Sequence, residues 1–316
     1  MTNNIETAFW DESSAHGQEI ARYATDDTRP ASAFMWPKPC VSLKNWQREQ
    51  ILVVKADGVV AGRAVLGAIH YPLAEIENLR VLPHYRGQEL GSRLVEDLVN
   101  RAAERGYLAV HLQTELDNRA AHALYTKHGF LPARQGESLR MVRFLNYPAL
   151  SQFLRDHPLA MIHSGSGDDE WELTWTDPIS GDRLTIGLSG GSSQRDSDGI
   201  GPGVASFRLH TAETGIEAKV SGQDLDLHVT VSNTGASKLS GNCRLLLNHG
   251  FDPLSDGGAQ FEAESGASCE MEFSVKTQDD FDCDLFKVAS YPSVPIAVEF
   301  FVGEHVFWLC RQVKIP

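Results

Sequence analysis

The chain has 316 residues and a formal net charge of −14, a length that predicts two or three domains. Residues 1–148 hold 17 basic and 17 acidic side chains, so the whole net charge lies in residues 149–316. An acidic chain without a basic tract argues against a nucleic-acid partner, which would need Lys and Arg contacts to phosphates. The longest apolar run, 51–69, contains Lys55, Asp57 and Arg63, so we expect no membrane span.

The N-terminal ten residues lack the basic and apolar stretches of a signal peptide, and the five cysteines include no CxxC pair. The sequence therefore predicts a cytoplasmic protein with reduced thiols. No metal site is expected, because the face formed by Asp224, Asp226 and His228 fits a solvated strand and has no further ligand at a suitable spacing.

The first half alternates strand and helix signals. In chain order we expect a helix over 13–24, a loop over 31–39, strands over 51–56, 59–69 and 74–82, a helix from 88 to 105, a strand over 108–112, a helix capped by Asp117 and ended by Gly129, and strands over 130–133 and 139–145. Asp57-Gly58 predicts a hairpin turn between the first two of these strands. This alternation predicts an α/β domain over residues 1–147.

The second half carries mostly strand and turn signals. After a helix over 149–156 we expect strands over 171–176, 183–188, 225–231, 269–275, 294–302 and 305–315, with a Gly/Ser-rich loop over 189–203. Residues 216–316 are predicted to form an all-β sandwich, whose pattern resembles that of immunoglobulin-like accessory domains. Residues 148–215 are either a β-rich connecting segment or part of that sandwich.

The most informative motif is a strand, a tight loop and a helix at residues 75–94. The loop reads Arg86-Gly87-Gln88-Glu89-Leu90-Gly91-Ser92 and opens the predicted helix. Such a turn directs free backbone N–H groups and the positive end of a helix dipole at one point, which suits a phosphate group.

This loop resembles the Arg/Gln-x-x-Gly-x-Gly/Ala motif of the GNAT superfamily of N-acetyltransferases. A second segment of that family, Asn…Ala…Leu-Tyr…Gly-Phe, is matched from Asn118 to Phe130. The resemblance covers about residues 1–147 and implies a GNAT acyltransferase fold that uses acetyl-CoA as co-substrate. Glu89 departs from the family pattern, because it stands where glycine is usual, and a carboxylate beside a pyrophosphate is unfavourable unless it turns to solvent.

The resemblance also implies roles for individual residues. The amides from Arg86 to Ser92 would hold the pyrophosphate of acetyl-CoA, and backbone groups of Val81 and Leu82 would pair with its pantetheine arm. Asn118 would contact that arm, and Tyr125 would give a proton to the departing thiolate. The backbone N–H near Val81 would stabilise the oxyanion.

The general base is left open by the sequence. An amine with a pKa of about 10 must lose a proton before it attacks a thioester. Glu75 and Glu77 share one face of their strand, and Glu75 aligns with a carboxylate that some family members use. Other members use a Glu at the position of Gln113, which cannot accept the proton. A proton relayed by solvent without a single base is the alternative. His84, His111 and His122 are interpreted as structural or exposed.

We therefore predict an N-acetyltransferase that moves an acetyl group to the amine of a small molecule or a protein in a ternary complex. The acidic second half would attract a cationic acceptor, although solubility explains that charge equally simply. The alternative function is a degenerate acyl-CoA-binding sensor whose β-sandwich binds a partner. The acceptor, the acyl-chain length and any oligomer are left open.

Overall fold

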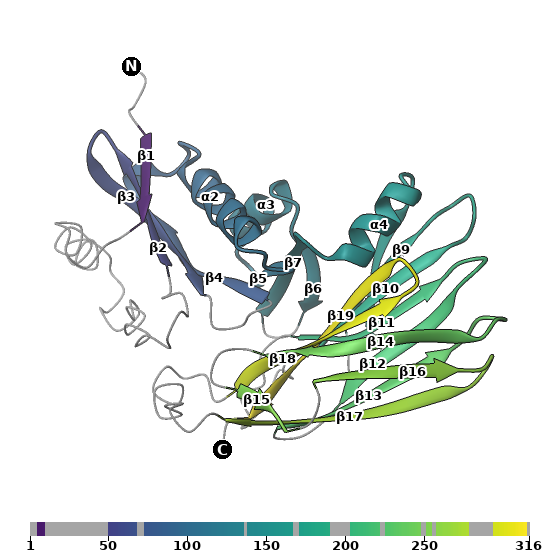
Figure 1. Ribbon diagram of the computed structural model, residues 1–316. Helices are drawn as coiled ribbons and strands as arrows, with labels where there is room; N and C mark the ends of the chain where they lie inside the picture. The colour runs from purple at the N-terminus through teal and green to yellow at the C-terminus, as the bar shows by residue number, and fades with distance from the viewer. Residues whose placement is uncertain are drawn as a thin grey trace. The chain divides into compact units, whose positions relative to one another are not determined.

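The computed structural model describes residues 5–9, 50–67, 73–135, 138–166, 171–189, 203–221, 225–247, 251–254, 257–277 and 293–314 (Figure 1). The chain divides into two compact units, and the division runs through the β6–β7 hairpin. Unit 1 comprises Met1–Leu131 with Arg140–Leu145, and unit 2 comprises Pro132–Leu139 with Asn146–Pro316. Among the described residues, no helix has the length and apolar character that crossing a membrane requires.

Unit 1 contains most of a seven-stranded sheet, whose order is β1-β2-β3-β4-β5-β7-β6. The strands are β1 Ile5–Phe9, β2 Gln50–Ala56, β3 Val59–Gly67, β4 Leu73–Val81, β5 Ala109–Glu115, β6 Leu131–Gln135 and β7 Ser138–Phe144. The predicted hairpin between β2 and β3 is confirmed, with Asp57 at φ 52° and Gly58 at φ 79°, the pair of positive angles that a type I′ turn requires. Strands β1 to β4 pair antiparallel, whereas β4 and β5 are parallel.

The helix α2, Leu90–Glu104, packs on β2, β3 and β4. Its buried face consists of Leu90, Leu94, Val95, Leu98, Val99 and Ala102, the four-residue repeat that predicted the helix. The helix α3, Arg119–Lys127, contacts α2 and is capped by Asn118, whose side-chain oxygen accepts the amide of Ala121 at 3.1 Å. The cap predicted at Asp117 is therefore wrong by one residue.

From Asn146 onward, unit 2 contains the helix α4, Pro148–Asp156, and two antiparallel sheets (Figure 1). The eight-stranded sheet has the order β15-β17-β13-β12-β11-β10-β9-β8, and the four-stranded sheet has the order β16-β14-β18-β19. The bounds are β8 Met161–Ser166, β9 Trp171–Thr176, β10 Arg183–Ser189, β11 Gly203–His210, β12 Gly215–Ser221, β13 Asp226–Asn233, β14 Leu239–Leu246, β15 Phe251–Pro253, β16 Gly258–Ala263, β17 Ser268–Thr277, β18 Ser293–Val302 and β19 His305–Lys314.

The two sheets pack against each other chiefly where β19 meets β11 and β12. The rings of Phe207 and Phe307 stack there with centroids 4.0 Å apart, and Phe300 meets Phe207 edge-on at 5.8 Å. Strands β8 to β11, within residues 148–215, lie in the same sheet as β12 and β13. The predicted helix over 13–24, the loop over 31–39 and most of the loop over 189–203 lie outside the described residues, as does Asp224.

Candidate functional site

The turn between β4 and α2 leaves the start of the helix open to an anion. A single 3₁₀ turn, Pro83–Tyr85, follows β4, and Gly87 at φ 79° and Glu89 at φ 59° bend the chain into α2. Glu89 occupies the N-cap position, yet its side chain accepts no hydrogen bond from the first turn of the helix. The amides of that turn, from Leu90 to Ser92, are therefore available to an external acceptor.

Basic side chains lie close to this turn. The guanidinium of Arg86 folds back, and its Nε donates to the carbonyl of Val81 at 3.1 Å. Lys127, in the last turn of α3, places its ammonium nitrogen 3.4 Å from Glu89 Oε1 and 3.4 Å from Ser92 Oγ. The loop and the end of α3 thus form one polar corner that suits a phosphate.

The two glycines of the motif differ in their surroundings. A Cβ added at Gly87 would meet nothing within 4 Å, so the outer side of the loop is open. A Cβ at Gly91 would lie 3.4 Å from Leu124 Cδ2, so Gly91 permits the close packing of α3 on α2. One glycine serves the turn and the other serves the approach of the two helices.

The backbone of Val81 faces the edge of β4 that is turned away from β3. The amide of Leu82 donates to Ala61 on β3 at 2.9 Å. In a planar trans peptide the carbonyl of the preceding residue points the opposite way, so the carbonyl of Val81 lies on the other edge, together with the Val81 amide. The carbonyl of Leu82 accepts the amide of Tyr85 at 2.9 Å, so both backbone groups of Leu82 are engaged within the fold.

That edge of β4 opens because β4 and β5 separate. Their parallel register covers Leu73 to Glu75 on β4 and Ala109 to His111 on β5 and ends there, although both strands continue. At this last registered pair, Glu75 Oε1 lies 3.8 Å from His111 Nδ1. The carboxylate of Glu75 is 21% exposed, whereas the side chain of His111 is 4% exposed. An acid–imidazole pair therefore lies where the two strands begin to separate.

Glu77 lies on the same side of β4 as Glu75. A Cβ added at Gly67 of β3 would lie 2.9 Å from Glu77 Oε1 and 3.7 Å from Glu75 Cβ, so both side chains flank one glycine. Asn78 follows at φ 50°, at a register irregularity between β3 and β4, and the strand bends beyond the two glutamates.

Tyr125 is nearly buried on α3, with 7% of its surface exposed and its ring 5.8 Å from the ring of Phe130. Burial raises the pKa of Tyr125 to about 12, so the hydroxyl is protonated throughout the neutral range. Asn118 begins the same helix, and its side-chain oxygen is engaged in the cap. Both residues of the second motif are thus carried by α3, as is Lys127.

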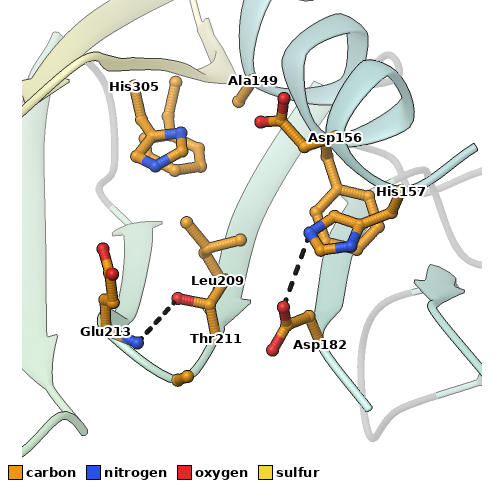
Figure 2. A pocket seen from close by; sticks show the side chains of 11 residues that line it. Ala149, Asp156, His157, Asp182, Leu209, Thr211, Glu213 and His305 are labelled. Atoms are coloured by element: carbon orange, nitrogen blue, oxygen red, sulfur yellow. Dashed lines mark hydrogen bonds and ion pairs between the residues drawn. The ribbon is translucent and has the colours of Figure 1, made fainter. Parts of the chain in front are cut away.

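A separate hollow of about 250 Å³ lies within unit 2, between α4, the end of β11 and the start of β19 (Figure 2). Its described lining has no Lys or Arg and includes Asp156, Asp182, Glu213, His157 and His305. Figure 2 shows His157 turned toward Asp182, 3.6 Å away, and Asp177 holds the other ring nitrogen at 3.0 Å. The side chains of His157, Asp177 and Asp182 contact one another, which indicates that they stabilise the turn at 177–182.

No group of three or more His, Cys, Asp or Glu side chains in the part of the chain that is described is arranged to hold a metal ion. The fold and the polar corner together define a class of α/β unit whose uncapped helix start suits a phosphate-bearing ligand, followed along the chain by an antiparallel β unit.

The comparisons with known proteins agree with this class. The model of the acetyltransferase (GNAT) family matches residues 18–130. The ribosomal protein bS18-alanine N-acetyltransferase of Escherichia coli is 30% identical over 100 residues, which are 32% of this chain and 67% of that protein. The mycothiol acetyltransferase of Jonesia denitrificans is 41% identical over 63 residues, 20% of each chain.

A Bacillus subtilis protein is 33% identical over 81 residues, 26% of this chain, and the match spans 53%, about half, of that relative's length. Among solved structures, the E. coli ribosomal-protein-S18-alanine N-acetyltransferase matches with a TM-score of 0.37 and 20% identity, covering 45% of this chain and 94% of that chain. A B. subtilis acetyltransferase in complex with CoA matches with a TM-score of 0.35 and 17% identity, covering 45% and 99%.

The chain belongs to the GNAT acetyltransferase family, with its GNAT fold in the N-terminal part and a mostly antiparallel β region that the family model leaves unassigned. The predicted fold class is confirmed. The family uses acetyl-CoA, and the uncapped first turn of α2, the backbone edge of Val81 that is turned away from β3 and the basic groups near the turn fit that molecule.

Two residues of this site were not singled out from the sequence. Lys127 lies within the second motif, from Asn118 to Phe130, but its separation of 35 positions from Ser92 in the sequence hides their proximity. His111 was interpreted as structural or exposed, and its pairing with Glu75 depends on the parallel register of β4 and β5. A basic residue in the last turn of the motif helix is the signal that could have indicated Lys127.

Proposed function

We propose that unit 1 transfers the acetyl group of acetyl-CoA to an amine by direct attack in a ternary complex. Bound acetyl-CoA supplies the activated acyl group, and the chain supplies binding, orientation and proton transfer. The observation that carries the proposal is the uncapped start of α2 beside the backbone edge of Val81 that is turned away from β3.

The backbone from Arg86 to Ser92 is proposed to hold the pyrophosphate, with Gly87, Gln88, Glu89, Leu90 and Gly91 contributing to the turn. Val81 is proposed to pair with the pantetheine arm and to direct its amide at the acyl oxygen, where negative charge develops during attack. The backbone amide and carbonyl of Leu82 already form hydrogen bonds within the fold. Leu82 is therefore proposed to contact the cofactor through its side chain. Asn118 is proposed to lie beside the arm.

Two side chains are proposed to move protons. Tyr125, whose hydroxyl is protonated at neutral pH and whose pKa burial raises further, would donate to the departing thiolate. Glu75 is the proposed proton acceptor, because its carboxylate is partly exposed and lies beside His111 where β4 and β5 separate. Glu77, on the same side of β4, is the second candidate, and a solvent relay is the third.

The acceptor is proposed to be a cationic amine, on a protein or a small molecule. The relative in E. coli is named for acetylating an alanine of ribosomal protein bS18, and the relative in J. denitrificans is named a mycothiol acetyltransferase. Support for a cationic acceptor comes from the net charge of −14, which lies in residues 149–316 and would attract positive molecules.

A CoA-binding sensor is the second candidate function, and the presence of Glu89 at the loop favours it. Thiol release from acetyl-CoA, measured with an alanine-initiated peptide, a lysine peptide, a polyamine and an aminoglycoside, separates the two. We expect at least one amine to stimulate release. Tight CoA binding without release for any amine would contradict the transferase and favour the sensor.

A further inference from the structure

Glu89 is an unusual residue for its position in three respects. It adopts the left-handed conformation, φ 59° and ψ 10°, which glycine adopts without strain. It stands at the N-cap without capping the helix. It also places a negative charge beside the amides that are proposed to bind a pyrophosphate.

The carboxylate of Glu89 is engaged by a residue from another helix. Lys127 Nζ lies 3.4 Å from Glu89 Oε1, and the two side chains are 59% and 81% exposed. The same ammonium lies 3.4 Å from Ser92 Oγ, on the first turn of α2. Lys127 is therefore within reach of both the carboxylate and the amide donors of the turn.

We propose that Glu89 is an internal competitor for Lys127, and that Lys127 is a pyrophosphate-contacting residue. This inference rests on the proposed function. Without cofactor, the carboxylate of Glu89 holds Lys127 at the mouth of the turn. With cofactor, Lys127 turns to the pyrophosphate, and Glu89, which is exposed, moves into solvent. The cost of separating the pair lowers the affinity for acetyl-CoA and tunes how readily CoA leaves.

Surface charge pairs of this kind contribute little, so the expected effects are modest. Glu89→Gln removes the charge and keeps the strained conformation, and we expect the Kd for CoA to fall by about twofold to fivefold. Glu89→Gly removes both the charge and the strain. CoA should therefore bind Glu89→Gly as tightly as it binds Glu89→Gln, and the melting temperature of Glu89→Gly should be higher than that of wild type. Lys127→Gln should weaken CoA binding.

The pair of residues should also be energetically coupled. Because Glu89 holds Lys127 back, Lys127→Gln should cost more affinity in the Glu89→Gln background than in the wild-type protein. The dependence of log Kd on log salt should be steeper for Glu89→Gln, since Lys127 is then fully available to phosphate.

The experiment is calorimetric titration of CoA and of dephospho-CoA into the full chain at two salt concentrations. The same titrations are made with Glu89→Gln, Glu89→Gly, Lys127→Gln and the double variant of Glu89→Gln with Lys127→Gln. Glu104→Gln is the matched control, because it removes the same charge from the other end of α2, about 22 Å away at 1.5 Å per residue. We expect this control to leave both affinities unchanged, and Glu89→Gln to tighten CoA and dephospho-CoA by the same factor.

A Kd for CoA that is the same in Glu89→Gln and wild type would overturn the inference while leaving the proposed function in place. A gain seen with CoA but lost with dephospho-CoA would overturn it too, because Lys127 would then serve the 3′-phosphate. Absence of CoA binding in every variant would contradict the proposed function and this inference together.

Discussion

Tyr125 is a buried residue whose hydroxyl is also the proposed general acid. Its hydroxyl is carried by α3, and burial raises its pKa to about 12. Tyr125→Phe should leave the Kd for CoA unchanged and lower kcat by about 10²-fold or more, the range for loss of a general acid. Steady-state thiol release checks this, with Tyr85→Phe as the control for loss of a tyrosine hydroxyl.

The raised pKa of Tyr125 also predicts how kcat depends on pH. A hydroxyl with a pKa of about 12 is still protonated at pH 10, so Tyr125 should produce no alkaline decline in kcat below pH 10. An alkaline limb near pH 9 that disappears in Tyr125→Phe would mean that the folded protein does not raise this pKa.

The role of Glu75 as general base is tested by the decline of kcat/KM at low pH, the acidic limb of the pH–rate profile. If its carboxylate accepts the proton, Glu75→Gln should lower kcat/KM by about 10²-fold or more and remove the acidic limb, whereas Glu77→Gln should retain it. The opposite result would transfer the role to Glu77, which flanks the same Gly67. A limb unchanged in both variants would favour the solvent relay.

At the scale of single elements, α3 depends on Asn118. Its side-chain oxygen accepts the amide of Ala121, so Asn118→Ala should lower the free energy of unfolding by about 1 kcal/mol. Asn118→Asp keeps the acceptor and should keep the stability, measured by thermal melting. If Asn118 also contacts the pantetheine arm through its amide group, Asn118→Asp should raise the KM for acetyl-CoA nevertheless.

The turn at 177–182 makes unit 2 sensitive to acid. Asp177 accepts the amide of Ile179 at 3.0 Å and the hydroxyl of Ser180 at 3.0 Å, and it faces His157. These contacts, led by the Ile179 amide, hold the pKa of Asp177 below its ordinary value of 3.8. Because the folded form binds a proton less readily than the unfolded form, the stabilisation is present above that value and is lost as the pH falls through the lowered pKa.

Asp177→Asn retains an acceptor for Ile179 and lacks the titrating charge. We expect wild type to be more stable than Asp177→Asn at neutral pH, and the difference in melting temperature to shrink below about pH 4. A difference that stays constant from pH 7 to pH 3 would contradict the assignment of this turn as acid-sensitive.

Several elements were predictable because their signals are local. The hairpin at Asp57-Gly58 needs two positive φ angles, and the buried face of α2 repeats every four residues. The contacts that complete the site are not local: Lys127 lies 38 residues from Glu89, and His111 meets Glu75 only through parallel pairing. The engagement of Leu82 by Ala61 depends on the register of β3 with β4, which sequence alone does not specify.

At the scale of the whole molecule, the charge step near residue 148 corresponds to a change of architecture. The neutral part carries the GNAT fold, and the acidic part carries two antiparallel sheets. The pairing order in those sheets, with β13 beside β17 and β14 beside β18, links segments far apart in the sequence. Alternation identifies such strands and does not identify their neighbours, so the sandwich was predictable as a class only.

The two compact units should respond separately to damage in one core. Phe307 is fully buried and stacks on Phe207, so Phe307→Ala should destabilise unit 2 by about 3 to 5 kcal/mol. We expect calorimetric melting to show an earlier transition for unit 2, with the Kd for CoA unchanged below that transition. If Phe307→Ala also weakened CoA binding below the melting transition of unit 2, the assignment of the cofactor site to unit 1 alone would be contradicted.

The central claim is that the turn from Arg86 to Ser92 binds the pyrophosphate of acetyl-CoA. Ser92→Glu tests it most directly, because an acidic residue in the first turn stabilises a helix and repels a phosphate. Calorimetric titration of acetyl-CoA into wild type should give one site per chain. In Ser92→Glu the Kd should rise by about tenfold or more while the melting temperature does not fall. An unchanged Kd in the folded variant would contradict the account.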